Sequence, residues 1–218
     1  MNEFVRGVAF ICEGQTERVF YHSILEHYLS KHEGYNLTKE LDHNTNDYNF
    51  ILTSENLSVL VKTYTVGTII AHTQAPANWF KNSCKLQHKH IDWTVFLCYD
   101  TDSHNNDISQ FYEGDWKELR KSLYKNRRTS IIDLAASADI EDIMLLDIEG
   151  VCSFLGIIQC PIPPGRKGKS KMKKIFRDNG SCYHEGEKAK LLIEHLNKDT
   201  IISKSSIPFS IIDDICFT

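Results

Sequence analysis

Short apolar runs alternate with amphipathic stretches along the first part of the chain. Residues 7 to 12, "GVAFIC", form a continuous apolar run, which is typical of a strand buried on both faces of a parallel sheet. After Gly14 the apolar residues recur at helical spacing, and Thr16 is a suitable N-cap, so an amphipathic helix is predicted directly behind the strand. The apolar positions of this helix are Val19, Phe20, Ile24, Tyr28 and Leu29.

The same alternation continues to about residue 156. Apolar and β-branched runs predict strands at 57 to 70, 93 to 99 and 129 to 137. Helical spacing predicts helices at 75 to 89, opened by Pro76, at 115 to 126 and at 139 to 156. Strands that alternate with helices favour an α/β fold with a doubly wound parallel sheet and helices on both faces.

Two segments depart from this alternation. Residues 33 to 56 are polar and rich in asparagine, and they predict an exposed loop or hairpin inserted into the sheet domain. From residue 157 the chain changes to a basic loop rich in proline and glycine, followed by predicted helices at 170 to 178 and 186 to 197. We therefore expect an α/β domain over 1 to 156 and a helical C-terminal extension over 157 to 218 that packs on it.

Composition excludes several classes of protein. The chain has 218 residues with 41% hydrophobic content, and no run approaches the roughly 18 to 20 apolar residues that span a membrane. The first residues do not read as a secretory signal, and seven scattered cysteines are typical of reduced thiols, so a cytoplasmic location is expected. The net charge of −4 means that any contact with nucleic acid is local.

Acidic residues follow the predicted strands. Glu13 ends the first strand, Asp100 and Asp102 follow the strand near 95, and Glu141 with Asp142 begin the helix behind the strand near 132. The carboxyl ends of parallel strands open onto the crevice in which α/β proteins bind ligands. Carboxylates gathered in one crevice repel one another, so cations are expected to compensate them.

Oxygen ligands of this kind suit Mg²⁺ or Mn²⁺. Asp100 and Asp102 stand at i and i+2 and can project the same way from extended backbone, so that both address one metal. Glu17 lies one helical turn beyond Glu13 and is a further candidate ligand. The alternative is structural, because acids near helix N-termini complement the helix dipole and aspartates form turns.

These strand-end motifs carry a resemblance to a known family. A Glu-Gly after the first strand and a later strand ending in Asp-x-Asp resemble the Toprim domain, and "ICEGQTERVFY" is similar to the opening of RloB-like and OLD-type Toprim proteins of bacterial defence systems. The segment "ASADIEDIMLLD" resembles a further element in which a glutamate precedes a helix. The separation of Glu13 and Asp100 is longer than in a compact Toprim core, and the insertion at 33 to 56 accounts for it.

The resemblance implies a Rossmann-like sheet of the Toprim type and a nuclease. Glu13, Asp100 and Asp102 would be catalytic, and these three with Glu17 and Glu141 would bind Mg²⁺ or Mn²⁺. The implied activity is metal-dependent hydrolysis of DNA or RNA by an effector of an anti-phage system. The alternative is a non-catalytic Toprim-like subunit that docks to an ATPase partner for signalling or scaffolding. The resemblance is also compatible with a homo-oligomer. A nucleotide-sugar transferase would use the Asp-Thr-Asp motif but leaves Glu13 without a role.

A lysine tract supplies a second candidate contact. Six positive charges fall within nine residues of an acidic chain, which is enough to attract a phosphate backbone, although a solvated loop is an equal alternative. We take Arg166, Lys167, Lys169, Lys171 and Lys174 as the candidate nucleic-acid-binding residues. The text "PPGRKGKS" is not a P-loop, because proline stands where its first glycine is required.

Overall fold

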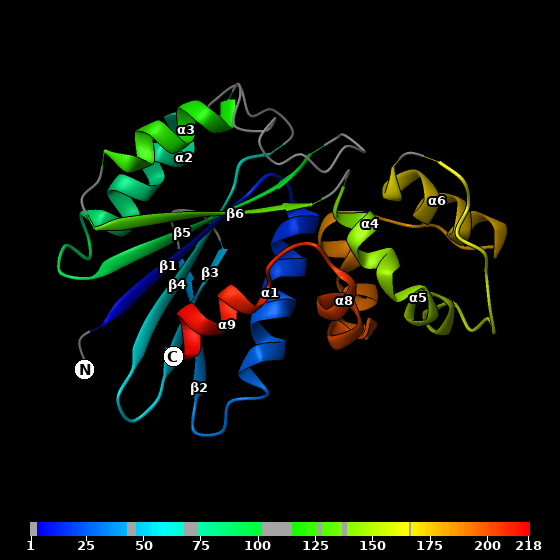
Figure 1. Ribbon diagram of the computed structural model, residues 1–218, viewed down its shortest axis with the longest axis horizontal. Helices are drawn as coiled ribbons and strands as arrows, with labels where there is room; N and C mark the ends of the chain where they lie inside the picture. The colour runs from blue at the N-terminus through cyan, green and yellow to red at the C-terminus, as the bar shows by residue number, and fades with distance from the viewer. Residues whose placement is uncertain are drawn as a thin grey trace.

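The computed structural model describes residues 4–42, 47–67, 74–101, 115–125, 128–136, 139–165 and 167–218. Within these ranges the strands form a six-stranded sheet of order β2-β3-β4-β1-β5-β6 (Figure 1). The strands are β1 (Arg6–Cys12), β2 (Asn36–Asp42), β3 (Asp47–Thr53), β4 (Ser58–Thr65), β5 (Asp92–Asp100) and β6 (Thr129–Ala136). β4, β1, β5 and β6 are parallel, whereas β2 and β3 pair antiparallel, so the expected α/β class is confirmed with a mostly parallel sheet.

Helices cover both faces of the sheet (Figure 1). One face carries α2 (Gln74–Trp79), the π-helix η1 (Phe80–Lys85) and α3 (Asp115–Tyr124). The other carries α1 (Gln15–Leu29), α4 (Ile140–Met144), the 3₁₀ helix η3 (Leu145–Asp147), α5 (Ile148–Phe154), α6 (Gly168–Asp178), the 3₁₀ helix η4 (Gly186–Ala189), α7 (Lys190–His195), α8 (Lys198–Lys204) and α9 (Ser210–Phe217).

The central strand β1 contains an unbroken apolar run because both of its faces are buried. Val8, Phe10 and Cys12 belong to the core beneath α1, whereas Ala9 and Ile11 belong to the core beneath α2 and α3. Successive side chains of a strand point to opposite faces, so a strand covered on both sides cannot alternate apolar with polar residues. The two cores therefore share β1 as their common wall.

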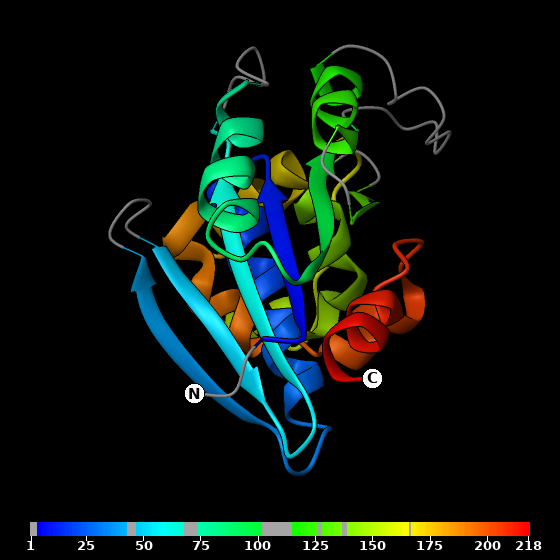
Figure 2. The same ribbon diagram turned by 90° about the vertical axis from the view of Figure 1, so that its left-hand side faces the viewer.

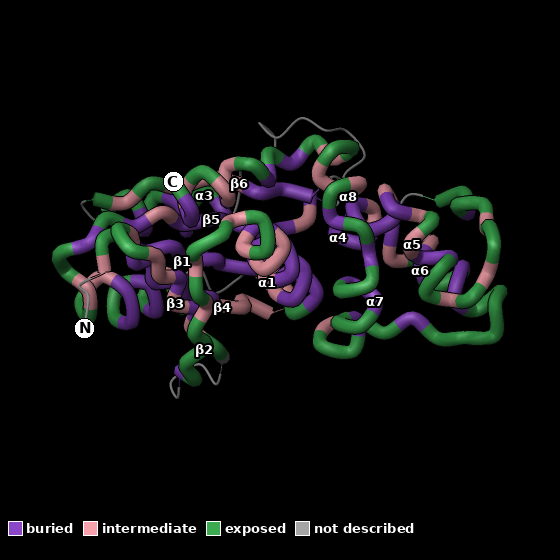
Figure 3. The backbone as a smooth tube through the Cα atoms, turned by 90° about the horizontal axis from the view of Figure 1, so that it is seen from below, coloured by how far each residue is buried: buried purple, intermediate pink, exposed green. Residues whose placement is uncertain are grey.

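The polar insertion is a hairpin that widens the sheet. β2 and β3 pair with each other, and β3 continues the sheet through β4 (Figure 2). β2 is mostly exposed, as the tube coloured by burial shows (Figure 3). An edge strand exposed on both faces tolerates the polar composition that, in the sequence, also fits a loop.

The helices of the C-terminal segment join the core beneath α1. The ring of Phe209, just before α9, lies 5.9 Å from that of Phe20 and 6.1 Å from that of Tyr21, both on α1. The guanidinium of Arg6 and the hydroxyl of Tyr35 donate hydrogen bonds to the backbone of α9, at Ile215 and Phe217. The segment after residue 156 thus completes the same apolar core as the sheet.

Three predicted helices are segmented. The helix expected at 75 to 89 begins as α2 and continues as the π-helix η1. The helix expected at 139 to 156 divides into α4, η3 and α5, because the Asp147 side chain accepts a hydrogen bond from Gly150 and starts a new helix within the stretch. The helix expected at 186 to 197 begins as the 3₁₀ turn η4. All seven cysteines are free thiols, and no helix in the described ranges has the length and apolar character to cross a membrane.

Candidate active site

A pocket of about 530 Å³ lies at the carboxyl ends of β1, β4 and β5. The first turn of α1, the start of α4, the start of α6 and the turn η4 complete its wall. Its lining residues are Glu13, Gly14, Gln15, Thr16, Glu17, Thr65, Gly67, Asp100, Glu141, Lys169, Glu185 and Gly186. Four of the five predicted metal-site acids, Glu13, Glu17, Asp100 and Glu141, therefore reach one pocket, and the fifth, Asp102, lies outside the described residues.

Glu13 and Asp100 are held together by the backbone. The Glu13 N–H donates to the Cys98 carbonyl over 2.8 Å, which extends the ladder between β1 and β5 by one step. Glu13 Oε2 in turn accepts a hydrogen bond from the Asp100 N–H over 3.0 Å. The parallel pairing of the two strands thus brings both acids to one edge of the sheet.

Asp100 is a strongly perturbed acid of the pocket. Burial, followed by the negative charges of Glu17, Glu13 and Glu141, raises the pKa of Asp100 to about 10. Its Oδ1 atom is buried and has no hydrogen-bond partner among the described residues. Such an oxygen is costly to bury without a donor or a cation.

Glu17 lies beside Asp100 and is buried, with 6% of its surface exposed. Burial raises the pKa of Glu17, and a hydrogen bond with Asp100 opposes that shift. Gly14, not Thr16, is the N-cap of α1 and has extended backbone. A Cβ at Gly14 would lie 2.7 Å from Glu17 Oε2, so the glycine leaves the space that this carboxylate occupies.

Glu141 lies in the first turn of α4 and lines the same pocket. Burial raises the pKa of Glu141 to about 7, although the Tyr183 hydroxyl donates a hydrogen bond to its Oε1 over 2.8 Å and lowers it. The negative charges of Asp139 and Glu17 also raise it. A carboxylate with a pKa near neutrality can take up and release a proton at physiological pH.

Two aspartates fasten α6 to α4 and so position the wall formed by these helices. Asp139 is the N-cap of α4, and its second oxygen accepts from the Lys169 N–H over 3.0 Å. Asp142 Oδ2 accepts from the Gly168 N–H over 2.9 Å, and its Oδ1 pairs with Lys171 over 2.7 Å. Asp142 is thus a structural acid that joins two helices, in line with the structural alternative for acids at helix starts.

The lysine tract is bound into local ion pairs. Lys171 pairs with Asp142, Lys174 pairs with Asp178 over 2.6 Å, and Lys169 pairs with Glu185. Lys167 is the exposed N-cap of α6, and Arg166 lies outside the described residues. Among the described residues of the predicted tract, Lys169 alone lines the acidic pocket, where its charge opposes the raised pKa of Glu17.

The pocket suits a hard divalent cation by its donor type. Its acidic side chains offer oxygen only, and Asp100 Oδ1 lacks a donor. Within the described ranges, however, no group of three or more His, Cys, Asp or Glu side chains is arranged to hold a metal ion. The carboxylates therefore share a pocket without forming a closed set of ligands.

Sequence reasoning missed the residues that support these acids. Asp139 carries a readable signal, since an aspartate directly before a helical stretch is a usual N-cap. Tyr183 and Glu185 lie in an irregular segment with no periodicity, and only the packing of that segment against α4 and α6 brings them to the site.

Comparison with known proteins does not identify a family. No protein-family model matches the chain, and no curated protein matches it. Among solved structures, the native futalosine hydrolase of Helicobacter pylori strain 26695 is similar at 11% identity and a TM-score of 0.31, over 96% of this chain and 97% of that chain. Helicobacter pylori MTAN is similar at 10% identity and a TM-score of 0.28, over 92% of this chain and 100% of that chain. Similarity at this level carries no argument about function.

Proposed function

We propose that the protein is a nuclease that hydrolyses phosphodiester bonds in DNA or RNA with the help of Mg²⁺ or Mn²⁺. The observation that carries the proposal is the convergence of Glu13, Glu17, Asp100 and Glu141 on one pocket at the carboxyl ends of the strands. Burial raises the pKa of three of them, so their ionised forms are disfavoured unless a cation compensates the charge.

The surroundings of each acid indicate which role it takes in the proposed reaction. Asp100, Glu17 and Glu13 would hold the cation, which supplies charge for the phosphodiester and a more acidic bound water. Glu141, with its pKa near 7, is suited to accept a proton from the attacking water. Lys169 pairs with Glu185 over 2.5 Å, and a phosphate oxygen that takes the place of this carboxylate would gain a positive partner in an otherwise acidic pocket.

The biological role rests on the motifs rather than on the pocket. The stretches around Glu13 and Asp100 resemble those of RloB-like and OLD-type Toprim proteins, and we extend the proposal to the effector of an anti-phage defence system. Nucleic acid is then the substrate, and an ATPase subunit is a proposed partner.

A cleavage assay tests the activity. Plasmid, single-stranded DNA and tRNA are incubated with the protein and Mg²⁺, Mn²⁺ or EDTA, alone and with any ATPase encoded beside it. We expect cutting that needs a divalent ion and that falls by about 100-fold or more in Glu13→Gln and Asp100→Asn. Asp178→Asn, which changes a half-exposed acid at the end of α6, is the matched control and should cut normally. Full cutting by the two site variants would refute the assignment.

The alternative of a non-catalytic subunit is favoured by one observation. The described acids do not form a closed set of metal ligands. If the protein acts by docking, Glu13→Gln and Asp100→Asn should both retain the phage-resistance phenotype, and only variants that disrupt binding of the partner should lose it.

A further inference from the structure

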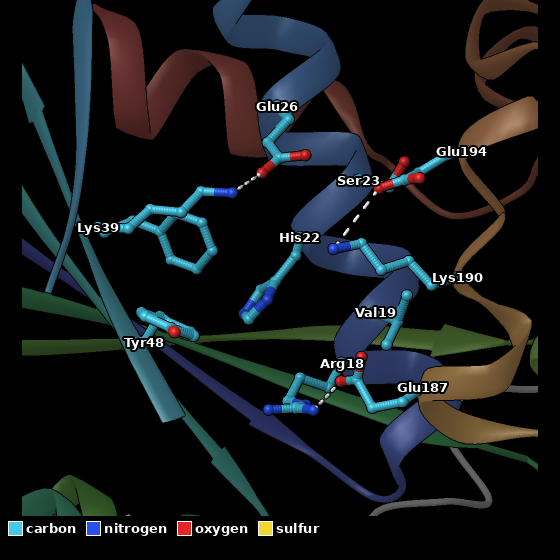
Figure 4. A pocket seen from close by; sticks show the side chains of 11 residues that line it. Arg18, Val19, His22, Ser23, Glu26, Lys39, Tyr48, Glu187, Lys190 and Glu194 are labelled. Atoms are coloured by element: carbon cyan, nitrogen blue, oxygen red, sulfur yellow. Dashed lines mark hydrogen bonds and ion pairs between the residues drawn. The ribbon is translucent and has the colours of Figure 1, made fainter. Parts of the chain in front are cut away.

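A second cavity lies on the other side of α1's first turns. It has a volume of about 380 Å³, within the range of about 300 to 1,000 Å³ that is usual for ligand pockets. α1 forms one wall, β2 and β3 of the hairpin form the second, and η4 with α7 form the third (Figure 4). Nothing in the proposed chemistry uses this cavity.

Aromatic side chains define one side of the cavity. Tyr48 and Phe50 stand at i and i+2 on β3 and so share the face of the hairpin that looks toward α1. The His22 ring packs edge-on against Phe50, with 4.6 Å between ring centroids. Tyr48 differs from these two, since 51% of its surface is exposed although it lines a cavity. An aromatic side chain with this exposure can stack on a flat ligand that enters the cavity.

The charges around the cavity cancel. Lys39 pairs with Glu26 over 2.6 Å and Lys190 pairs with Glu194 over 3.7 Å, while Arg18 pairs with Glu187 (Figure 4). A phosphate or another anion would have to displace a carboxylate from one of these pairs. A neutral ring with donors and acceptors on its edge can instead bond to both members of a pair, because carboxylates accept and ammonium groups donate.

The cavity adjoins the acidic pocket through two pairs of consecutive residues. Glu17 lines the acidic pocket and Arg18 lines the second cavity, and the same holds for Gly186 and Glu187. The Gly186 N–H donates to Thr16 Oγ1 over 2.9 Å, which fastens η4 to α1 and makes a common wall. The two cavities therefore lie on either side of this contact, and a strand that occupies both must pass over it.

We propose that this cavity binds a nucleobase of a single-stranded nucleic acid whose backbone lies at the acidic pocket. A nucleobase is flat and neutral, so it can stack on Tyr48. Its edge carries donors and acceptors that can bond to the three ion pairs. The proposal rests on the proposed nuclease function, which supplies the strand, and adds that the substrate is single-stranded near the cut.

Binding of a fluorescent base tests the proposal without any cleavage. A short single-stranded oligonucleotide with one 2-aminopurine is titrated with the protein in Ca²⁺, an oxygen-bound ion that can compensate the acidic pocket, and a gel checks that the oligonucleotide stays intact. Quenching reports stacking of that base. Tyr48→Ala should weaken binding about 5- to 100-fold, the usual effect of removing one stacking platform, and Tyr48→Phe should retain it. Tyr124→Ala removes an aromatic that is 61% exposed at the end of α3 and serves as the matched control.

The outcomes separate this proposal from the nuclease proposal. Equal binding by wild type and Tyr48→Ala, with an unchanged thermal midpoint, overturns the nucleobase site even if the protein cuts with Mg²⁺. Quenching that is lost in Tyr48→Ala upholds the site even if no cutting is found. If 2-aminopurine riboside binds as tightly as the oligonucleotide, the cavity takes a free nucleoside, and the inference about a strand is overturned.

Discussion

The Asp100 N–H donates a hydrogen bond to Glu13 Oε2 over 3.0 Å and joins two residues 87 positions apart in the chain. The bond connects the ends of two neighbouring parallel strands, so it forms only when the sheet has assembled in register. It holds the Glu13 carboxylate beside Asp100 in a pocket where burial and negative charge disfavour ionisation.

Asp100→Asn should stabilise the protein in the absence of divalent ions. The pKa of Asp100 is raised to about 10 from 3.8, so near pH 8 the folded state holds a proton that the unfolded state has released, and this lowers the free energy of unfolding. We expect a gain of about 1–3 kcal/mol in urea unfolding with EDTA. Asp178→Asn should change stability by less than about 0.5 kcal/mol. A loss of stability in Asp100→Asn would contradict this view of the pocket.

Mg²⁺ should stabilise the wild-type protein and leave Asp100→Asn nearly unaffected. A ligand that binds only the folded state at about 100 times its Kd adds about 2.7 kcal/mol. The thermal midpoint of each protein is measured at increasing Mg²⁺ concentrations and compared with its value in buffer that contains neither Mg²⁺ nor Ca²⁺. Equal shifts in the two proteins would mean that the ion binds elsewhere.

The stability of the metal-free protein should fall as the pH rises from about 4.5 to about 7. The pKa of Glu141 is raised from 4.5 to about 7, so in that window the folded state binds more protons than the unfolded state, and the slope of unfolding free energy against pH is negative. Glu141 accounts for a loss on the order of 2–3 kcal/mol. Glu141→Gln keeps an acceptor for Tyr183 and should flatten the slope, whereas an unchanged slope would assign the effect to other groups.

Lys169→Ala and Lys174→Ala should differ although both lysines lie on α6. Lys169 lines the acidic pocket, so its loss should reduce cutting about 10- to 100-fold, as expected for removing one positive group from a transition state. Lys174 pairs with Asp178 on the surface, so its loss should leave the rate constant unchanged and at most reduce the salt dependence of binding. Equal effects on cutting and on salt dependence would favour a diffuse basic surface.

Gly168→Ala should loosen the junction of α6 with α4. A Cβ at Gly168 would lie 2.1 Å from the Asp142 backbone nitrogen, and a backbone atom cannot move away as a side-chain end can. We expect a loss of about 2–3 kcal/mol in urea unfolding, together with reduced cutting because Lys169 is the next residue. Ser170→Ala, at an exposed position two residues further on, should be neutral.

Local pattern was sufficient for most of the elements. The apolar run at 7 to 12 corresponds to β1, the run at 93 to 99 to β5, and the helical spacing after Gly14 to α1. These predictions hold because each element buries a face, and the spacing of buried residues follows from strand or helix geometry alone. The hairpin of β2 and β3 was less clear, since a mostly exposed edge strand has little apolar pattern to read.

The positions of the pocket's acids could be predicted from the sequence, whereas the residues that contact these acids could not. Glu13 and Asp100 end strands, and the topology of a parallel sheet sends such residues to one edge, so sequence order alone brings them together. Glu141 follows β6 by the same rule. By itself, then, the sequence determined the α/β class and the edge of the sheet where carboxylates meet. Only the tertiary structure brought Lys169, Tyr183 and Glu185 to that edge and set the second cavity beside it. These residues arrive through the packing of α6 and η4 against α1 and α4, and long-range packing of this kind leaves no periodic trace in the chain.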